Sequence, residues 1–161
     1  MPHIATQFAK IFAALTGALL FTLPCLAADD RATPEQAVAM VHRVIADMKS
    51  AGKDAVIAEI NTLSSKYRDR DLYVTVMDLN GKELAHGSNK KMQGVNLMDF
   101  KDTDGKPYIK ERIEIVNAKG KGWQDYKFVN PVTKQMEPKS MYFEKFEDVI
   151  VSCGVYKSAT P

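Results

Sequence analysis

Two hydrophobic periods divide the chain behind its N-terminal segment. Between Val38 and Tyr67, apolar residues recur every three or four positions, the spacing of one buried helical face. Thr33-Pro34-Glu35-Gln36 precedes them and combines a capping threonine, a proline suited to the first helical position and a glutamine that can close a capping box. Gly52 interrupts the pattern, so we expect one long kinked helix or two helices in series.

The period then changes from helical to alternating. Leu72–Met77 is rich in β-branched and aromatic residues, which predicts a strand. The pair Asn80-Gly81 favours a tight hairpin turn, and Lys82–Gly87 would form the returning strand. The two segments therefore predict an antiparallel hairpin.

A second helix and three more strands complete the expected order. Pro107 opens the helix, glycines at 120 and 122 end it, and its apolar face carries Ile109, Ile113 and Val116. The strands are expected at Trp123–Val129, Lys139–Phe146 and Val149–Tyr156, with turn signals between them. This order predicts an α+β domain in which a long N-terminal helix packs on a five-stranded antiparallel sheet, with the second helix between strands 2 and 3.

The N-terminal segment predicts export. An uncharged apolar run, Ile11–Leu23, is followed by Pro24 and then by Cys25-Leu26-Ala27, which fits the small-x-small pattern of a signal peptidase site. We expect residues 1–27 to be a cleaved signal peptide and the protein to be periplasmic. The alternative is an uncleaved membrane anchor, because the uncharged sequence continues to Ala28. A lipoprotein is a weaker alternative, because Pro24 stands before Cys25 where a small residue is expected.

Composition is ordinary for a soluble globular domain. Apolar residues make up 45% and charged residues 26% of the 161 positions, and the net charge is +2. Acidic and basic residues are interleaved, with no basic stripe long enough to follow a phosphate backbone. Nucleic acid is therefore not an expected partner.

Few residues favour catalytic chemistry. After cleavage the chain keeps two histidines, His42 and His86, and one cysteine, Cys153, which give no convincing zinc-ligand set. Nucleophile-elbow, phosphate-loop and dinucleotide-binding motifs are missing from the sequence. Cys153 lies in an apolar run, so a buried inert thiol is favoured over a nucleophile that uses His86 as its base. We expect no catalytic residue, no metal and no cofactor, and hence no enzyme.

Aromatic and basic residues crowd onto the last three predicted strands. They are Trp123, Tyr126, Lys127, Lys139, Tyr142 and Tyr156. A sheet face with tyrosine hydroxyls and a lysine could hold a carboxylate inside an apolar wall. The alternative is that the aromatic residues are core and the lysines are solvated.

Linked motifs in these segments resemble a known family. The pieces are DLYVTVMDLNG, HGSN, DGKPYIKE, GWQDYKFVNP, EPKSMYFEKF and SCGVY, in this order. Together they are similar to a bacterial single Cache domain, type 2, from about Ala37 to Tyr156. The resemblance implies a PAS-like sheet and an extracytoplasmic sensor pocket, often for small organic acids. We therefore expect one domain at residues 33–156 and a tail at 157–161.

The resemblance also implies site residues. Tyr126, Lys139 and Tyr142 match aromatic and basic positions of the family and are expected to contact the ligand. Trp123 and His86 are expected to be pocket walls or to orient the ligand. Strand parity sets Lys139 and Tyr142 on opposite faces of the sheet unless a bulge intervenes, so one of them could have a structural role.

Domains of this family usually sit outside a chemoreceptor or histidine kinase. This sequence shows no second apolar segment and no output domain before Pro161. We therefore expect a periplasmic binder of a small organic acid that acts with a separate membrane-bound receptor, kinase or transporter. The alternative is an interaction protein that docks on a membrane receptor or kinase without a ligand of its own.

Overall fold

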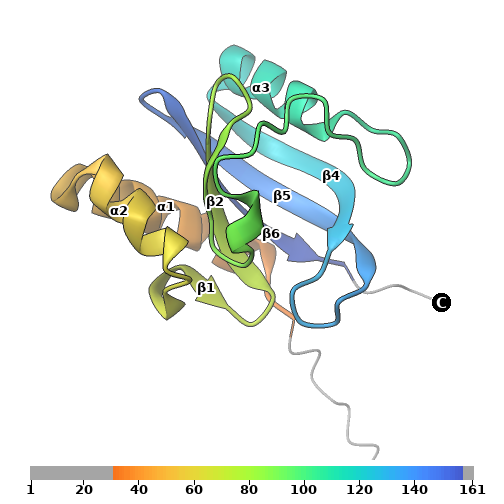
Figure 1. The fold of residues 1–161 in the computed structure, drawn as a ribbon, viewed down its shortest axis with the longest axis horizontal. Coiled ribbons are helices and arrows are strands. Elements are labelled where there is room, and N and C mark those ends of the chain that lie inside the picture. The colour runs from red at the N-terminus through yellow and green to blue at the C-terminus, as the bar shows by residue number, and fades with distance from the viewer. Residues whose placement is uncertain (1–30, 158–161) are drawn as a thin grey trace, which may run out of the picture.

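The computed structural model describes residues 31–157, which form one antiparallel sheet with helices and connecting segments packed on both of its faces. Helices α1 and α2 cover one face of the sheet, and α3 lies over the other face (Figure 1). The expected signal peptide, residues 1–27, and the expected tail beyond residue 157 lie outside the described residues. Among residues 31–157, no helix combines the length and the apolar character that crossing a membrane requires.

Two helices in series open the described chain, as the glycine at position 52 predicts. Helix α1 spans Pro34–Ala51 and α2 spans Lys53–Asn61. Thr33 caps α1 by accepting a hydrogen bond from the Gln36 amide, and the Gln36 side chain accepts one from the Thr33 amide. The predicted capping box is therefore confirmed. Gly52 separates the helices with φ of 94°, a conformation that glycine adopts without a steric penalty.

All strand pairs of the sheet are antiparallel, and β6 lies near its centre. The strand order is β1-β2-β6-β5-β4, with β3 also paired to β2. The elements are η1 Ser65–Tyr67, β1 Arg68–Asp69, β2 Leu72–Asp78, β3 Glu83–His86, β4 Lys121–Val129, β5 Met136–Phe146 and β6 Val149–Tyr156. The predicted α+β fold and its five strands are confirmed. The sheet gains a sixth strand, β1, whose two exposed charged residues show no hydrophobic alternation.

The second helix lies between β3 and β4, as predicted. Helix α3 spans Tyr108–Lys119 and ends at Gly120, which has the left-handed φ of 74° that favours glycine at a helix C-terminus. The connection from β3 to α3 contains the short helix η2, Lys90–Met92. This connection and α3 together cover the face of the sheet opposite α1.

The sheet separates two hydrophobic cores. The core on the α1 side contains Val41, Val44, Tyr142 and Cys153, and the core on the α3 side contains Ile109, Tyr126 and Met141. Every residue of β6 is buried, because this strand contributes side chains to both cores. Its largely apolar sequence therefore follows from its position near the middle of the sheet.

Candidate ligand-binding site

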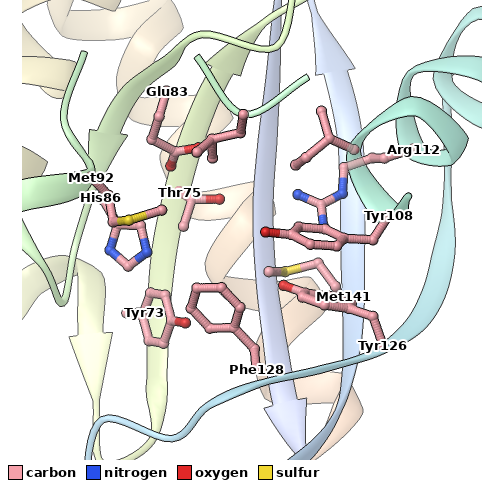
Figure 2. Close-up of a pocket in the computed structure, with 12 residues that line it drawn as sticks. Tyr73, Thr75, Glu83, His86, Met92, Tyr108, Arg112, Tyr126, Phe128 and Met141 are labelled. Carbon is pink, nitrogen blue, oxygen red and sulfur yellow. The ribbon is translucent and has the colours of Figure 1, made fainter. Parts of the chain in front are cut away.

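A small cavity lies on the α3 side of the sheet, between the strands, η2 and α3 (Figure 2). Its polar lining consists mainly of Tyr73, Glu83, His86, Tyr108, Arg112 and Tyr126. The centre of a water molecule can occupy about 20 Å³ of the cavity. That volume suits about one or two water molecules, or a ligand of similar size.

Arg112 places a guanidinium group in this cavity with only 2% of the residue exposed. It lies three positions after Ile109 and four before Val116, so all three share the buried face of α3. The guanidinium carbon lies 5.6 Å from the ring centroids of Tyr126 and Phe143. Aromatic faces attract the cation without satisfying its N–H donors.

Two donors of Arg112 have no hydrogen-bond partner among the described residues. They are Nε and Nη2, both buried. These two nitrogens form one edge of the planar guanidinium, and their N–H bonds run parallel, at the spacing of the two oxygens of a carboxylate. Because an unpaired buried charge is costly, this edge is suited to an anion.

His86 forms the opposite wall of the cavity as a neutral ring. Its Nδ1 accepts hydrogen bonds from the backbone amides of Ser88, at 3.3 Å, and Asn89, at 3.1 Å. Burial, together with the charge of Lys139, lowers the pKa of His86 to about 3. A neutral imidazole that accepts through Nδ1 carries its proton on Nε2. The ring also stacks on Tyr73, with 5.0 Å between the centroids.

Glu83 contributes a carboxyl group to the same cavity. It is 2% exposed, and its Oε1 atom has no hydrogen-bond partner in the described part of the chain. Burial raises the pKa of Glu83 to about 8, against the opposing influence of the Arg112 and Lys139 charges. At neutral pH the protonated carboxyl therefore predominates.

Tyr126 and Lys139 are direct cross-strand partners in the β4–β5 pair, and partners of this kind share a face of the sheet. Tyr126 lines the cavity and stacks on Tyr108, with 4.5 Å between the ring centroids. Burial raises the pKa of Tyr126, so its hydroxyl stays protonated and can donate a hydrogen bond.

Lys139 is fully buried beside the cavity and is not part of its lining. Its Nζ lies 3.8 Å from the ring centroid of Tyr73 and donates a 3.3 Å hydrogen bond to the Tyr156 hydroxyl. Burial lowers the pKa of Lys139 to about 7. The Lys139 ammonium that the sequence predicted for the pocket thus lies behind the ring of Tyr73, and the cation that lines the cavity is the guanidinium of Arg112.

Tyr142 and Trp123 lie on the other face of the sheet. Tyr142 belongs to the core under α1 and donates a 2.8 Å hydrogen bond to Glu144. Trp123 pairs with Tyr142 across β4 and β5, with 5.3 Å between the ring centroids. The predicted separation of Lys139 and Tyr142 by strand parity is confirmed. Of the five residues expected from sequence, the structure brings His86 and Tyr126 together at the cavity.

Sequence reasoning overlooked Arg112 and Glu83. A signal for Arg112 was available, because a charged residue at helical spacing between Ile109 and Val116 must share their buried face. Glu83 was harder to find. The β2–β3 register shifts between Val76 and Met77, and this irregularity changes which β3 residues face the cavity.

Cys153 faces away from the cavity, towards α1. Its Sγ lies 3.7 Å from the sulfur of Met40, and burial raises its pKa to about 12. Since His86 lies on the opposite face, the two do not form a nucleophile and base pair. Within residues 31–157, no three His, Cys, Asp or Glu side chains gather in a way that could hold a metal ion.

The described residues thus form a helix-covered antiparallel sheet that borders a small cavity lined by a buried guanidinium group. The family model described as Single Cache domain 2 matches residues 28–159. The chain therefore belongs to the single Cache domain 2 family, whose members are non-catalytic, extracytoplasmic sensor domains that bind ligands. The predicted family is confirmed.

Solved structures share this fold. A methyl-accepting chemotaxis protein from Vibrio parahaemolyticus RIMD 2210633 is 22% identical with a TM-score of 0.65, over 76% of this chain and 86% of that one. A Cache chemosensory domain solved as a structural basis for carboxylic acid recognition is 23% identical with a TM-score of 0.63, over 76% and 91%. A periplasmic sensor domain of a chemotaxis protein is 24% identical with a TM-score of 0.60, over 76% and 88%.

Proposed function

We propose that the protein is a periplasmic sensing module that binds a small organic carboxylate and acts with a separate membrane-bound receptor, kinase or transporter. The observation that carries this proposal is the buried edge of Arg112, whose Nε and Nη2 donors lack hydrogen-bond partners among residues 31–157. The carboxylic acid recognition described for a Cache chemosensory domain of the same fold supports this class of ligand. The chemotaxis sensor domains among the similar structures support a membrane-bound partner.

In the proposed complex the ligand carboxylate accepts two parallel hydrogen bonds from Arg112. His86 Nε2–H and the Tyr126 hydroxyl supply further donors from the neighbouring walls. Leu97, Phe128 and Met141 provide apolar surface for the hydrocarbon part. Such a combination of apolar walls and a few polar groups is usual for a small-ligand site.

The volume of the cavity limits the ligand to a short chain. About 20 Å³ is accessible to the centre of a water molecule, which is less than even a two-carbon acid requires. Met92 lines the cavity from η2 and is only partly buried. Because a methionine side chain adapts its shape easily, a change of the Met92 rotamer provides the additional room in this proposal.

The residues predicted from sequence have unequal roles in this proposal. His86 and Tyr126 contact the ligand. Lys139 contributes a positive charge from behind Tyr73 and does not bind the ligand directly. Tyr142 and Trp123 support the opposite face of the sheet.

Isothermal titration calorimetry with acetate, propionate and pyruvate tests the role of Arg112. Arg112→Met removes both donors and is expected to abolish measurable binding. Arg112→Lys keeps the charge but loses the parallel donor pair, so an affinity loss of roughly 10-fold to 100-fold is expected. Arg43→Met, on the exposed face of α1, is the matched control and should bind as the wild type does. Unchanged affinity in Arg112→Met would reject the assignment.

A second candidate function is docking on a membrane receptor or kinase without a ligand. It is favoured by three apolar side chains exposed near the β4–β5 turn, Val129 at 44%, Val132 at 61% and Met136 at 47%. A thermal-shift screen separates the two functions, because a ligand that binds only the folded state raises the melting temperature. No stabilisation by any small acid, together with loss of partner binding in Val132→Asp, would favour docking.

A further inference from the structure

The carboxyl group of Glu83 is buried, and no hydrogen bond or ion pair of this group within residues 31–157 accounts for its burial. It faces the same cavity as Arg112, and its Oε1 atom has no hydrogen-bond partner among the described residues. A buried polar atom without a partner costs about 1–3 kcal/mol. An ion pair with Arg112 would remove that cost, yet neither side chain bonds to the other in residues 31–157.

A local irregularity of the hairpin directs Glu83 into the cavity. In a regular strand, residues 83 and 86 would face opposite sides of the sheet. Here Met77 pairs with Glu83 and Thr75 pairs with His86, because the register shifts between Val76 and Met77. Both Glu83 and His86 therefore line the cavity, while Ala85 packs into the core on the α1 side. A bulge of this kind commonly re-aims a side chain next to a functional site.

Glu83 and Arg112 approach the cavity from different elements, β3 and α3 (Figure 2). The pKa of Glu83 is sensitive to the charge of Arg112, which shows that the two groups are within electrostatic reach of each other. In a cavity that suits only a few non-hydrogen atoms, a ligand held by Arg112 also meets the Glu83 carboxyl. One Glu83 oxygen can accept a hydrogen bond whether the carboxyl is ionised or protonated.

We infer that the cavity selects short carboxylic acids that carry a hydrogen-bond donor, a hydroxyl or an ammonium group, on the carbon next to the carboxylate, and that Glu83 accepts the hydrogen bond from this donor. The inference rests on the proposed function, because it presupposes that Arg112 holds the carboxylate. Beyond that function, the inference assigns to Glu83 the recognition of a second group of the ligand. A plain acid such as acetate leaves Glu83 Oε1 unsatisfied, and a site built to hydrogen-bond a ligand group discriminates strongly against analogues that lack it.

Calorimetry with two matched sets of ligands tests this selectivity. The two-carbon set is acetate, glycolate and glycine, and the three-carbon set is propionate, L-lactate and L-alanine. The wild-type protein is expected to bind at least one donor-bearing member of each set ten-fold or more tightly than the plain acid. In Glu83→Leu this preference should disappear, so that the donor-bearing acids and the plain acid of each set bind within about three-fold of one another.

Glu83→Gln separates the two kinds of donor and keeps the shape of the side chain. Its amide oxygen still accepts a hydrogen bond from a hydroxyl group, so a preference for glycolate and lactate would persist. It cannot ionise, so a preference for glycine and alanine would fall at least ten-fold. Because this variant is isosteric, it tests the inference even if Glu83→Leu does not fold.

The outcomes distinguish the two proposals. Equal affinity for all members of a set in the wild type, or a preference that survives in Glu83→Leu, overturns the role of Glu83 and leaves carboxylate binding by Arg112 intact. No binding of any of the six ligands to the folded wild type overturns both proposals for short acids.

Discussion

Burial sets the charge state of single residues around the cavity. Arg112 brings a guanidinium cation to the lining of the cavity. Lys139 and Glu83 respond in opposite directions, since burial lowers the pKa of the first to about 7 and raises that of the second to about 8. Each shift favours the neutral form. A permanent cation thus faces the cavity next to two groups that titrate near neutral pH.

The shift at Lys139 predicts a pH-dependent effect on the free energy of unfolding. The unfolded chain holds the Lys139 proton up to its ordinary pKa of 10.5, while the folded protein releases it near 7. Between these values the unfolded state binds more protons, so raising the pH stabilises the wild type through this residue. Lys139→Met removes the effect.

Urea unfolding of the wild type and of Lys139→Met at pH 7 and pH 9.5 measures this pH-dependent contribution to the free energy of unfolding. The stability of wild type relative to Lys139→Met should increase over this interval by on the order of 2–3 kcal/mol. A constant difference would show that the Lys139 ammonium is not desolvated. Lys49→Met, on the exposed side of α1, is the matched control for the loss of a lysine side chain.

At the scale of elements, local signals control where the helices begin and the hairpin turns. The capping box of Thr33 and Gln36 starts α1, and the turn at Asn80-Gly81 places Gly81 at φ of 80°. Gly81 also passes close to the backbone of Met98, 3.2 Å from where a Cβ atom would lie. These short-range features set where the long helix begins and where the hairpin turns.

Removing the cap of α1 should destabilise the whole domain modestly. Thr33→Ala deletes the hydroxyl that accepts from the Gln36 amide and is expected to cost about 1 kcal/mol. Thr33→Ser keeps the acceptor and should stay within about 0.5 kcal/mol of wild type. Chemical unfolding measures both values. Equal stability of the two variants would mean that water replaces the cap without cost.

At the scale of the whole molecule, the sheet divides structural packing from the proposed recognition. The α1 side packs Val44, Tyr142 and Cys153 into a hydrophobic core, while the α3 side surrounds the cavity. Side chains of one strand that point to opposite faces share no partners. Substitutions on the two sides should therefore act independently on stability and on ligand affinity.

Val44→Ala tests this division. Val44 is fully buried under α1, so its truncation should lower the free energy of unfolding by roughly 1–3 kcal/mol. Its affinity for the bound acid should be unchanged, because the cavity lies on the other side of the sheet. Met141→Ala, which opens the cavity wall, should change both quantities. A several-fold change of affinity in Val44→Ala would show that the two faces are energetically linked.

The sequence by itself determined the elements with strong local signals and the family. The capped helix, the hairpin, α3 and the run of strands follow from periodicity, turn residues and capping, which act over a few positions along the chain. The placement of Lys139 and Tyr142 on opposite faces of the sheet followed from strand parity in the same way. Strand β1 could not be predicted from the sequence, because its two exposed charged residues carry no periodic hydrophobic signal.

Only the tertiary structure decided which charged groups reach the cavity. Arg112 and Glu83 are 29 positions apart in sequence, and they line one cavity because α3 packs over the sheet and a register shift turns Glu83 inwards. The depth of Lys139 behind Tyr73 was equally invisible from sequence, since desolvation depends on every segment packed around a group. Local pattern specifies the elements, whereas the chemistry of a buried site depends on contacts between segments far apart in the chain.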